Sequence, residues 1–176
     1  MFTERWYSYF FDIARTVAKQ SKDPSTKVGA IVVNSDKRIV ATGYNGFPKG
    51  CDDDGSLYAD RSYKLKHVCH AEANCVCQAA SSGQRFQDGV IFITLRPCVD
   101  CAKLIIQSGI KEVHYLCNSF EENKREERLK TQGALDLNDW RVDKQLSIDM
   151  LKSAGVKVIQ YSTGVLGDRI LDVSEL

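Results

Sequence analysis

Two short motifs hold side chains that are able to bind a metal ion and move protons. His70 is followed two residues later by Glu72, and Pro97 precedes Cys98 and Cys101 in a Cys-x-x-Cys pattern. Two cysteines three positions apart at the start of a helix present both sulfur atoms on one face, and the positive end of the helix dipole favours their thiolate forms. If a second helix brings His70 alongside, one imidazole and two thiolates converge on a single ion.

One nitrogen and two sulfur ligands suit Zn²⁺, and three protein ligands leave a fourth coordination position open, as in catalytic zinc sites. Zinc at such a site lowers the pKa of its bound water to about 7. Glu72 is not needed as a ligand, so we expect it to be the catalytic proton carrier. A bare Cys-x-x-Cys also fits a redox pair or a structural zinc; His70 and Glu72 favour the catalytic metal.

Hydrophobic periodicity and turn residues predict the elements that position these motifs. Pro97 and Gly109 mark the two ends of the helix that carries both cysteines. The further predicted elements are helices at 4–20, 70–80 and 143–154 and strands at 28–33, 38–42, 90–94, 112–117 and 156–160. A first antiparallel hairpin followed by alternating βα units predicts a three-layer α/β/α fold with a five-stranded mixed sheet.

Composition narrows the class of protein. The 176 residues fit a single domain over 1–176, in which 43–69 reads as a long functional loop and 118–142 as a charged surface segment. Lys and Arg number 24 against 23 Asp and Glu, a net charge of +1 that argues against a nucleic-acid partner. No apolar stretch suits a leader or a membrane span, so we expect no membrane partner. The seven cysteines then indicate reduced thiols and a cytoplasmic location.

Beyond the metal motifs, the chain resembles the deoxycytidylate deaminases, a family with a cytidine deaminase-like fold. His-x-Glu followed by Pro-Cys-x-x-Cys is the known signature of the zinc nucleobase deaminases. The resemblance covers residues 5–117 well and the C-terminal third loosely. It is carried by Ser21-Lys22-Asp23-Pro24, Gly43-Tyr44-Asn45-Gly46, His70-Ala71-Glu72-Ala73-Asn74, Thr94-Leu95-Arg96-Pro97-Cys98-Val99-Asp100-Cys101-Ala102-Lys103 and Ile105-Ile106-Gln107-Ser108-Gly109-Ile110.

The resemblance implies hydrolysis of dCMP to dUMP and ammonia, which supplies dUMP for dTTP synthesis. Glu72 would carry a proton from zinc-bound water to N3 of the base and a second proton to the departing amine. The Ala71 N–H would contact the base carbonyl, and Asn45 would hold a sugar hydroxyl. Tyr115 is a candidate aromatic partner of the base, with core packing as the equal alternative. The candidate phosphate cations are Lys22, Lys27, Lys49 and Arg61.

The resemblance also implies regulation and assembly. The family is activated by dCTP and inhibited by dTTP, and is often hexameric, so we expect a homo-oligomer. Gly43, Tyr44, Asn45 and Gly46 are the candidate effector residues, although a simple turn after a strand explains them too. Mg²⁺ would accompany the effector triphosphate, with Asp52 to Asp54 as candidate ligands or as a solvated acidic turn. Cys51 and His67 are candidates for a second zinc, or for ordinary core or loop residues.

Three alternatives remain open from the sequence. A deaminase of tRNA adenosine or single-stranded DNA would share the same zinc site and Glu72, but the near-neutral charge and Gly43 to Gly46 argue against it. Cytosine, cytidine and dCTP are other substrates within the same class, because the sequence does not select the phosphate cations. A non-catalytic zinc-binding domain is the third alternative, and such a domain would have no need of Glu72.

Overall fold

One mixed sheet organises the molecule. The computed structural model describes residues 2–117, 140–163 and 170–172. The strand order is β2-β1-β3-β4-β5-β6, in which β3, β4 and β5 are parallel and the other pairings are antiparallel. The five predicted strands are present, and a three-residue sixth strand, too short to leave a sequence pattern, pairs with β5. The strands are β1 (Gly29–Val33), β2 (Ile39–Tyr44), β3 (Val90–Ile93), β4 (Glu112–Cys117), β5 (Lys157–Thr163) and β6 (Ile170–Asp172).

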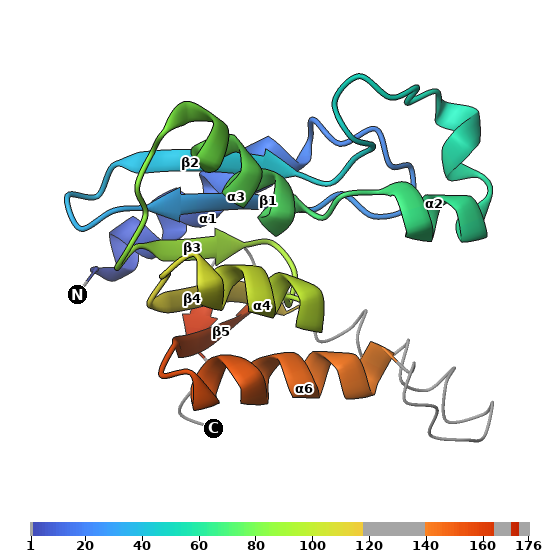
Figure 1. The fold of residues 1–176 in the computed structure, drawn as a ribbon. Coiled ribbons are helices and arrows are strands. Elements are labelled where there is room, and N and C mark those ends of the chain that lie inside the picture. Colours follow the sequence, from blue (N-terminus) through green and yellow to red (C-terminus); the bar gives the residue numbers. More distant parts are fainter. Residues whose placement is uncertain (1, 118–139, 164–169, 173–176) are drawn as a thin grey trace.

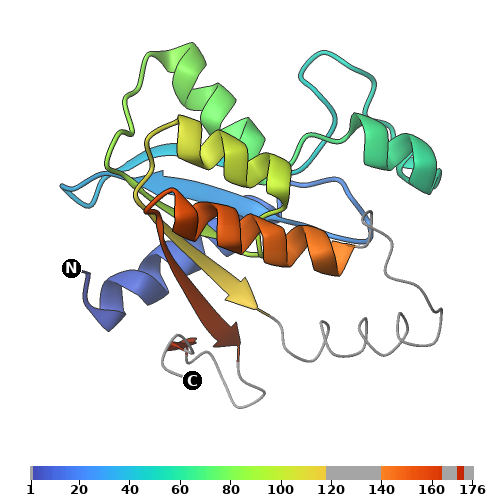
Figure 2. The same cartoon turned by 60° about the horizontal axis from the view of Figure 1, so that its bottom comes forward.

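Helices cover both faces of this sheet, which confirms the predicted three-layer α/β/α arrangement. Helix α1 lies on one face, and α3, α4 and α6 lie side by side on the other (Figures 1 and 2). The helices are α1 (Glu4–Ala18), α2 (Arg61–His67), α3 (Ala71–Ser82), α4 (Val99–Gln107) and α6 (Trp140–Ser153). None of the helices in the described part of the chain is long and apolar enough to cross a bilayer.

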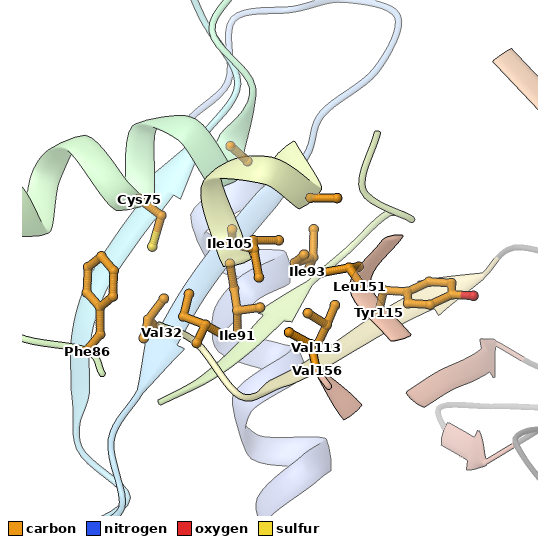
Figure 3. Close-up of a cluster of buried hydrophobic side chains, with 14 of the residues drawn as sticks. Val32, Cys75, Phe86, Ile91, Ile93, Ile105, Val113, Tyr115, Leu151 and Val156 are labelled. Atoms are coloured by element: carbon orange, nitrogen blue, oxygen red, sulfur yellow. The ribbon is translucent and has the colours of Figure 1, made fainter. Parts of the chain in front are cut away.

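Alternating side chains of the central strands fill two apolar clusters. Ile91 and Ile93 of β3 pack with Ile105 of α4 and Leu151 of α6 (Figure 3). Phe92, between them in sequence, points to the other face and packs against Phe10 of α1. Strands buried on both faces read as continuous apolar runs, which is why Val90 to Ile93 is recognisable in the sequence. The two clusters hold the helices rigidly on the sheet.

Two glycines allow helices to approach the sheet closely. A Cβ atom at Gly29 would lie 2.6 Å from the backbone nitrogen of Ala18 in α1. On the opposite face, a Cβ atom at Gly43 would lie 2.5 Å from the backbone nitrogen of Cys75 in α3. Gly43 therefore sets the distance between β2 and the helix whose N-terminus is His70.

The predicted long loop over 43–69 contains two short helices. A 3₁₀ turn, η1 (Gly55–Tyr58), begins after Asp54, whose side chain accepts a hydrogen bond from Ser56 N at 2.9 Å. Helix α2 begins after Asp60, whose side chain accepts one from Tyr63 N at 3.0 Å. Aspartate is a strong N-cap residue. The sequence analysis missed these helices because neither is long enough to show a clear apolar period.

Helix α6 begins earlier than the sequence predicted. The expected start was residue 143, with 118–142 as a charged surface segment, whereas the helix begins at Trp140. Residues 118–139 of that segment lie outside the described residues. The first residues of α6 are mostly polar or charged, so the apolar period starts only further along the helix.

Candidate active site

The predicted metal ligands stand at the starts of two neighbouring helices. His70 is the N-cap of α3 and Cys98 is the N-cap of α4, both with extended backbone conformation. Cys101 follows in the first turn of α4. Helices α3 and α4 pack side by side on the same face of the sheet (Figure 1). The three side chains at their N-termini therefore come together.

The ligand atoms lie at distances that a zinc ion requires. His70 Nδ1 is 3.4 Å from Cys98 Sγ and 3.4 Å from Cys101 Sγ. In a tetrahedral site with Zn–N and Zn–S bonds of about 2.0–2.3 Å, nitrogen and sulfur ligands stand roughly 3.6 Å apart. Within the described part of the chain, this is the one group of three such ligand atoms within 4.8 Å of one another. The donor set and its spacing therefore fit Zn²⁺.

Hydrogen bonds among these three side chains favour the thiolate form of Cys98. A hydrogen bond from the Cys101 thiol, together with the neighbouring His70, lowers the pKa of Cys98 to about 4. The hydrogen bond to Cys98 in turn raises the pKa of His70 to about 9, against the opposing effect of burial. The pKa of Cys101 is raised, chiefly because its thiol donates to Cys98. The surroundings therefore stabilise a thiolate at Cys98, the charged form in which cysteine binds a metal ion.

Glu72 lies in the first turn of α3 and is buried, with 4% of its surface exposed. Burial raises the pKa of its carboxyl group, opposed by its own backbone N–H and by His70. A carboxyl group with a raised pKa exchanges protons more readily near neutral pH. Its position next to the metal ligands suits the role of proton carrier that the sequence suggested.

A cavity of about 250 Å³ opens over these residues. It is lined by His70, Glu72 and Cys98 and by two further predicted residues, Asn45 and Ala71. A second hollow, of about 530 Å³, lies over the β1–β2 turn and the end of α3 and is lined by none of the predicted site residues. The chemistry of the lining therefore identifies the smaller cavity as the active-site candidate.

Asn45 lies in the cavity wall, but its side chain already holds neighbouring backbone. It is 5% exposed; its Oδ1 accepts a hydrogen bond from Val28 N at 2.7 Å and its Nδ2 donates to Thr26 O at 2.9 Å. These bonds fix the backbone of residues 26–28, which also line the cavity at Thr26 and Val28. Contact with a sugar hydroxyl stays a prediction.

The structure does not bring Tyr115 to the cavity. Its ring lies in the apolar cluster of the sheet, 3% exposed, and its hydroxyl donates to Gln160 at 2.6 Å (Figure 3). The guanidinium of Arg96, which does line the cavity, lies 5.6 Å from the centre of the Tyr115 ring. Tyr115 therefore packs in the core, and its contact with the base stays a prediction.

The four candidate effector residues have different surroundings. Gly43 is held against α3, and Tyr44 is 44% exposed while its carbonyl accepts from Asn74 at 2.8 Å. Gly46 and Cys69 form an isolated bridge, with N–O distances of 3.1 and 2.8 Å. This bridge closes the two ends of the 47–68 segment directly before His70.

The second-metal candidates Cys51 and His67 are both exposed. His67 stacks on the Tyr63 ring at 3.9 Å, and its Nδ1 lies 2.8 Å from Tyr63 O. Neither residue joins a group of three metal-ligating side chains within the described residues. Asp52 to Asp54, the magnesium candidates, form no such group there either; Asp53 pairs with Lys22 at 2.8 Å.

Several cavity residues were missed by the sequence analysis. Arg61 was a candidate cation and lines the cavity, whereas Lys64, Arg96 and Asp143 line it without having been singled out. The fully buried Asp23 was quoted only as part of a family motif. Four of the lining residues come from separate segments of the chain, and no local sequence pattern indicates that they meet: Asp23, Lys64, Glu72 and Arg96.

Asp23 and Lys64 form an ion pair at the cavity wall. Lys64 Nζ donates to Asp23 Oδ1 at 2.8 Å and to Ser25 Oγ at 2.6 Å, and the lysine side chain is 14% exposed. Burial by itself would raise the pKa of Asp23, but hydrogen bonds from Lys64, Ser25 and Thr26 outweigh it and the pKa is lowered. The pair ties α2 to the 21–28 segment and closes one side of the cavity.

Known proteins are similar to this chain in sequence and in fold. A family model described as the cytidine and deoxycytidylate deaminase zinc-binding region matches residues 4–117. The deoxycytidylate deaminase of Pongo abelii is 42% identical over 124 residues, which are 67% of this chain and 68% of that protein. The deoxycytidylate deaminase of Homo sapiens is 40% identical over 123 residues, 67% of this chain and 68% of that protein.

A solved structure extends the likeness to most of the chain. The dCMP deaminase from the cyanophage S-TIM5, in complex with dCMP and dUMP, is 26% identical, covers 91% of this chain and 99% of its own, and has a TM-score of 0.68. The family match spans the two metal motifs and all five segments that carried the resemblance. This chain therefore belongs to the zinc-binding cytidine and deoxycytidylate deaminase family.

Proposed function

We propose that this protein hydrolyses the 4-amino group of dCMP, releasing ammonia and dUMP. The observation that carries the proposal is the meeting of His70, Cys98 and Cys101 at a small cavity whose wall includes His70, Cys98 and the buried Glu72. Its further support is the 40–42% identity to deoxycytidylate deaminases and the fold shared with a phage enzyme solved with dCMP and dUMP.

Each residue has a distinct task in this proposal. His70, Cys98 and Cys101 hold the zinc ion, which when bound supplies a water molecule of lowered pKa. Glu72 would accept a proton from the attacking water and deliver it to N3 of the cytosine ring. It would then accept the proton of the hydroxyl group added at C4 and pass it to the amine, which leaves as ammonia. One carboxyl group performs both transfers, so its raised pKa suits a group that must be base and then acid.

The cavity supports a small substrate. Ligand cavities commonly measure about 300–1,000 Å³, and this one, at about 250 Å³, lies just below that range, so it suits a single nucleotide base. As the first residue of α3, Ala71 has an N–H without an intrahelical partner, and we propose that it donates to the base carbonyl. Asn45 then acts by holding the 26–28 backbone against the nucleotide.

We assign the phosphate to Arg61. Lys64 is committed to Asp23 and Ser25, and Arg96 lies against Tyr115 with its Nη2 3.4 Å from Gln160 Oε1. Arg61 is exposed at the cavity and a guanidinium binds phosphate oxygens in a bidentate manner. Lys27 and Lys49 are exposed and do not line the cavity.

A substrate panel tests the proposed function. Zinc-loaded protein would be incubated with dCMP, dCTP, CMP, cytidine and short RNA and DNA oligomers, and the deaminated product quantified by chromatography. We expect the highest kcat/KM on dCMP. Turnover confined to an oligomer would show that the protein is a nucleic-acid deaminase. Turnover of cytidine equal to that of dCMP would show that the phosphate is not recognised.

We also propose the regulation that the family resemblance implies: activation by dCTP with Mg²⁺, inhibition by dTTP, a homohexamer and a cytoplasmic role in supplying dUMP for dTTP synthesis. The support for this is family membership, together with the exposure of Tyr44, which precedes the cavity residue Asn45 in the sequence. Initial rates at limiting dCMP, measured with and without each triphosphate, test the regulation. Light scattering, which measures the mass of the assembly, tests the hexamer. Rates that respond to neither triphosphate would refute the regulation, and a mass that is not that of six chains would refute the hexamer.

A further inference from the structure

The inward face of α6 changes from apolar to polar where it reaches the metal ligands. Leu151 and Ile148 lie in the apolar cluster with Ile105 of α4. Towards the helix start, the next inward positions are Ser147, with no exposed surface, and half-buried Asp143. Polar side chains at buried helix positions are costly unless they are hydrogen-bonded, so their partners indicate their purpose.

Both side chains bind the backbone on either side of a zinc ligand. Ser147 Oγ donates to the carbonyl oxygen of Pro97 at 2.8 Å. Asp143 Oδ2 accepts from the backbone N–H of Val99 at 3.3 Å. Pro97 and Val99 are the two neighbours of Cys98, so α6 holds both peptide groups that set the direction of the Cys98 side chain.

We propose that Ser147 and Asp143 are positioning residues for Cys98, acting on the metal site through its backbone. The proposal rests on the zinc site of the proposed function. Cys98 is the N-cap of α4, with φ −83° and ψ 173°, so its carbonyl accepts the first helix hydrogen bond from Ala102 N at 2.9 Å, while its own φ and ψ are not helical. Removing a hydrogen-bonding group that orients a metal ligand commonly weakens metal binding by about 10- to 100-fold.

Zinc release tests this inference without measuring catalysis. Zinc-loaded wild-type protein, Ser147→Ala, Asp143→Ala and Asp143→Asn would be mixed with an excess of a coloured chelator. We expect both alanine variants to release zinc about 10-fold faster. Asp143→Asn keeps an oxygen that accepts from Val99 and is expected to release zinc at nearly the wild-type rate. Cobalt-substituted alanine variants should show altered thiolate-to-metal absorption.

Two variants of α6 serve as controls. Asp149→Asn removes a charge from an exposed position of the same helix, where Asp149 accepts from Gln145 at 2.9 Å. Ile148→Val weakens the apolar contact between α6 and α4 without touching the Pro97–Val99 backbone. Both are expected to keep the wild-type release rate and cobalt spectrum, even though Ile148→Val lowers the melting temperature.

The outcomes separate this inference from the proposed function. Equal zinc release by wild type and both alanine variants would overturn it, as would equal acceleration by Ile148→Val, because the effect would then be one of general stability. A wild-type protein that binds zinc but leaves dCMP intact would refute the proposed substrate while leaving the release result decisive for Ser147 and Asp143.

Discussion

At the residue scale, the three proposed metal ligands and Glu72 have separate tasks in the proposed reaction. The ligand atoms are spaced for an ion, whereas the Glu72 carboxyl is buried beside them with a raised pKa, caused mainly by burial. Such a group can be changed without removing a zinc ligand. The proton-carrying role is therefore separable from metal binding.

Replacement of Glu72 by Gln tests that separation. The amide has nearly the same shape but cannot accept and release a proton at neutral pH, so we expect kcat to fall by at least about 10²–10⁴-fold. Zinc content, measured by elemental analysis, should equal that of the wild type. A kcat within tenfold of the wild type would contradict the role, and loss of zinc would show that Glu72 supports the metal instead.

Arg61→Ala tests the assignment of the phosphate. Losing a charge-assisted contact to an anion raises the KM for dCMP, by about 10-fold for a contact of roughly 1.5 kcal/mol. Turnover of deoxycytidine, which has no phosphate, should be nearly unchanged. Arg85→Ala, a charge change outside the cavity lining, is the control. An equal loss on both substrates would indicate that Arg61 shapes the cavity and does not bind phosphate.

At the scale of elements, the site forms where α3 and α4 begin close together. Helix α2 closes one side of the cavity through Lys64. The bounds of α3 and α4 were predictable from the sequence. Pro97 marks the start of α4, Gly83 and Gly109 mark the ends of the two helices, and His70 and Cys98 stand in a known motif. The contacts of Lys64, Asp143 and Ser147 were not predictable. They join residues 41 to 50 positions apart, and no sequence period reports such pairings.

Gly43→Ala tests how closely α3 must approach β2. The added Cβ would lie 2.5 Å from Cys75 N, so we expect a loss of about 1–3 kcal/mol in the free energy of unfolding and a displaced His70. Gly55→Ala is the control, because a Cβ there meets nothing within 4 Å. Urea denaturation of both variants measures the difference. Equal stability of the two variants would show that α3 does not need to approach β2 this closely.

The Asp23–Lys64 pair makes stability depend on pH. The pKa of Asp23 is lowered in the folded state, so the carboxylate stabilises the protein above its unfolded pKa of about 3.9, and this contribution is lost as pH falls through the lower folded value. Asp23→Asn should cost about 3 kcal/mol at pH 7, because it leaves Lys64 without its buried partner.

Urea unfolding of Asp23→Asn and of the exposed control Asp36→Asn, from pH 7 down to pH 3, measures this effect. The difference between wild type and Asp23→Asn should shrink below about pH 4, whereas Asp36→Asn should follow the wild type throughout. A difference that stays constant with pH would mean that hydrogen bonding at Asp23 matters and its charge does not.

At the scale of the whole molecule, the sheet acts as a platform with two apolar clusters, and the chemistry lies at one end of its helices. The layers and five of the strands followed from apolar runs and turn residues. The runs are clearest in β1 and β3, which are buried on both faces, whereas the edge strand β2 is only partly buried. The short α2 and three-residue β6 lack such runs and were found only in the structure. We propose that this platform assembles a zinc-dependent deaminase of dCMP.

The most direct measurement is dUMP formed from dCMP as a function of zinc bound per chain. Protein stripped with a chelator and titrated back with Zn²⁺ should form dUMP at a rate proportional to zinc content, reaching its limit at one ion per chain. Formation of dUMP by zinc-free protein at the full rate, or fully zinc-loaded protein that leaves dCMP unchanged, would contradict the account.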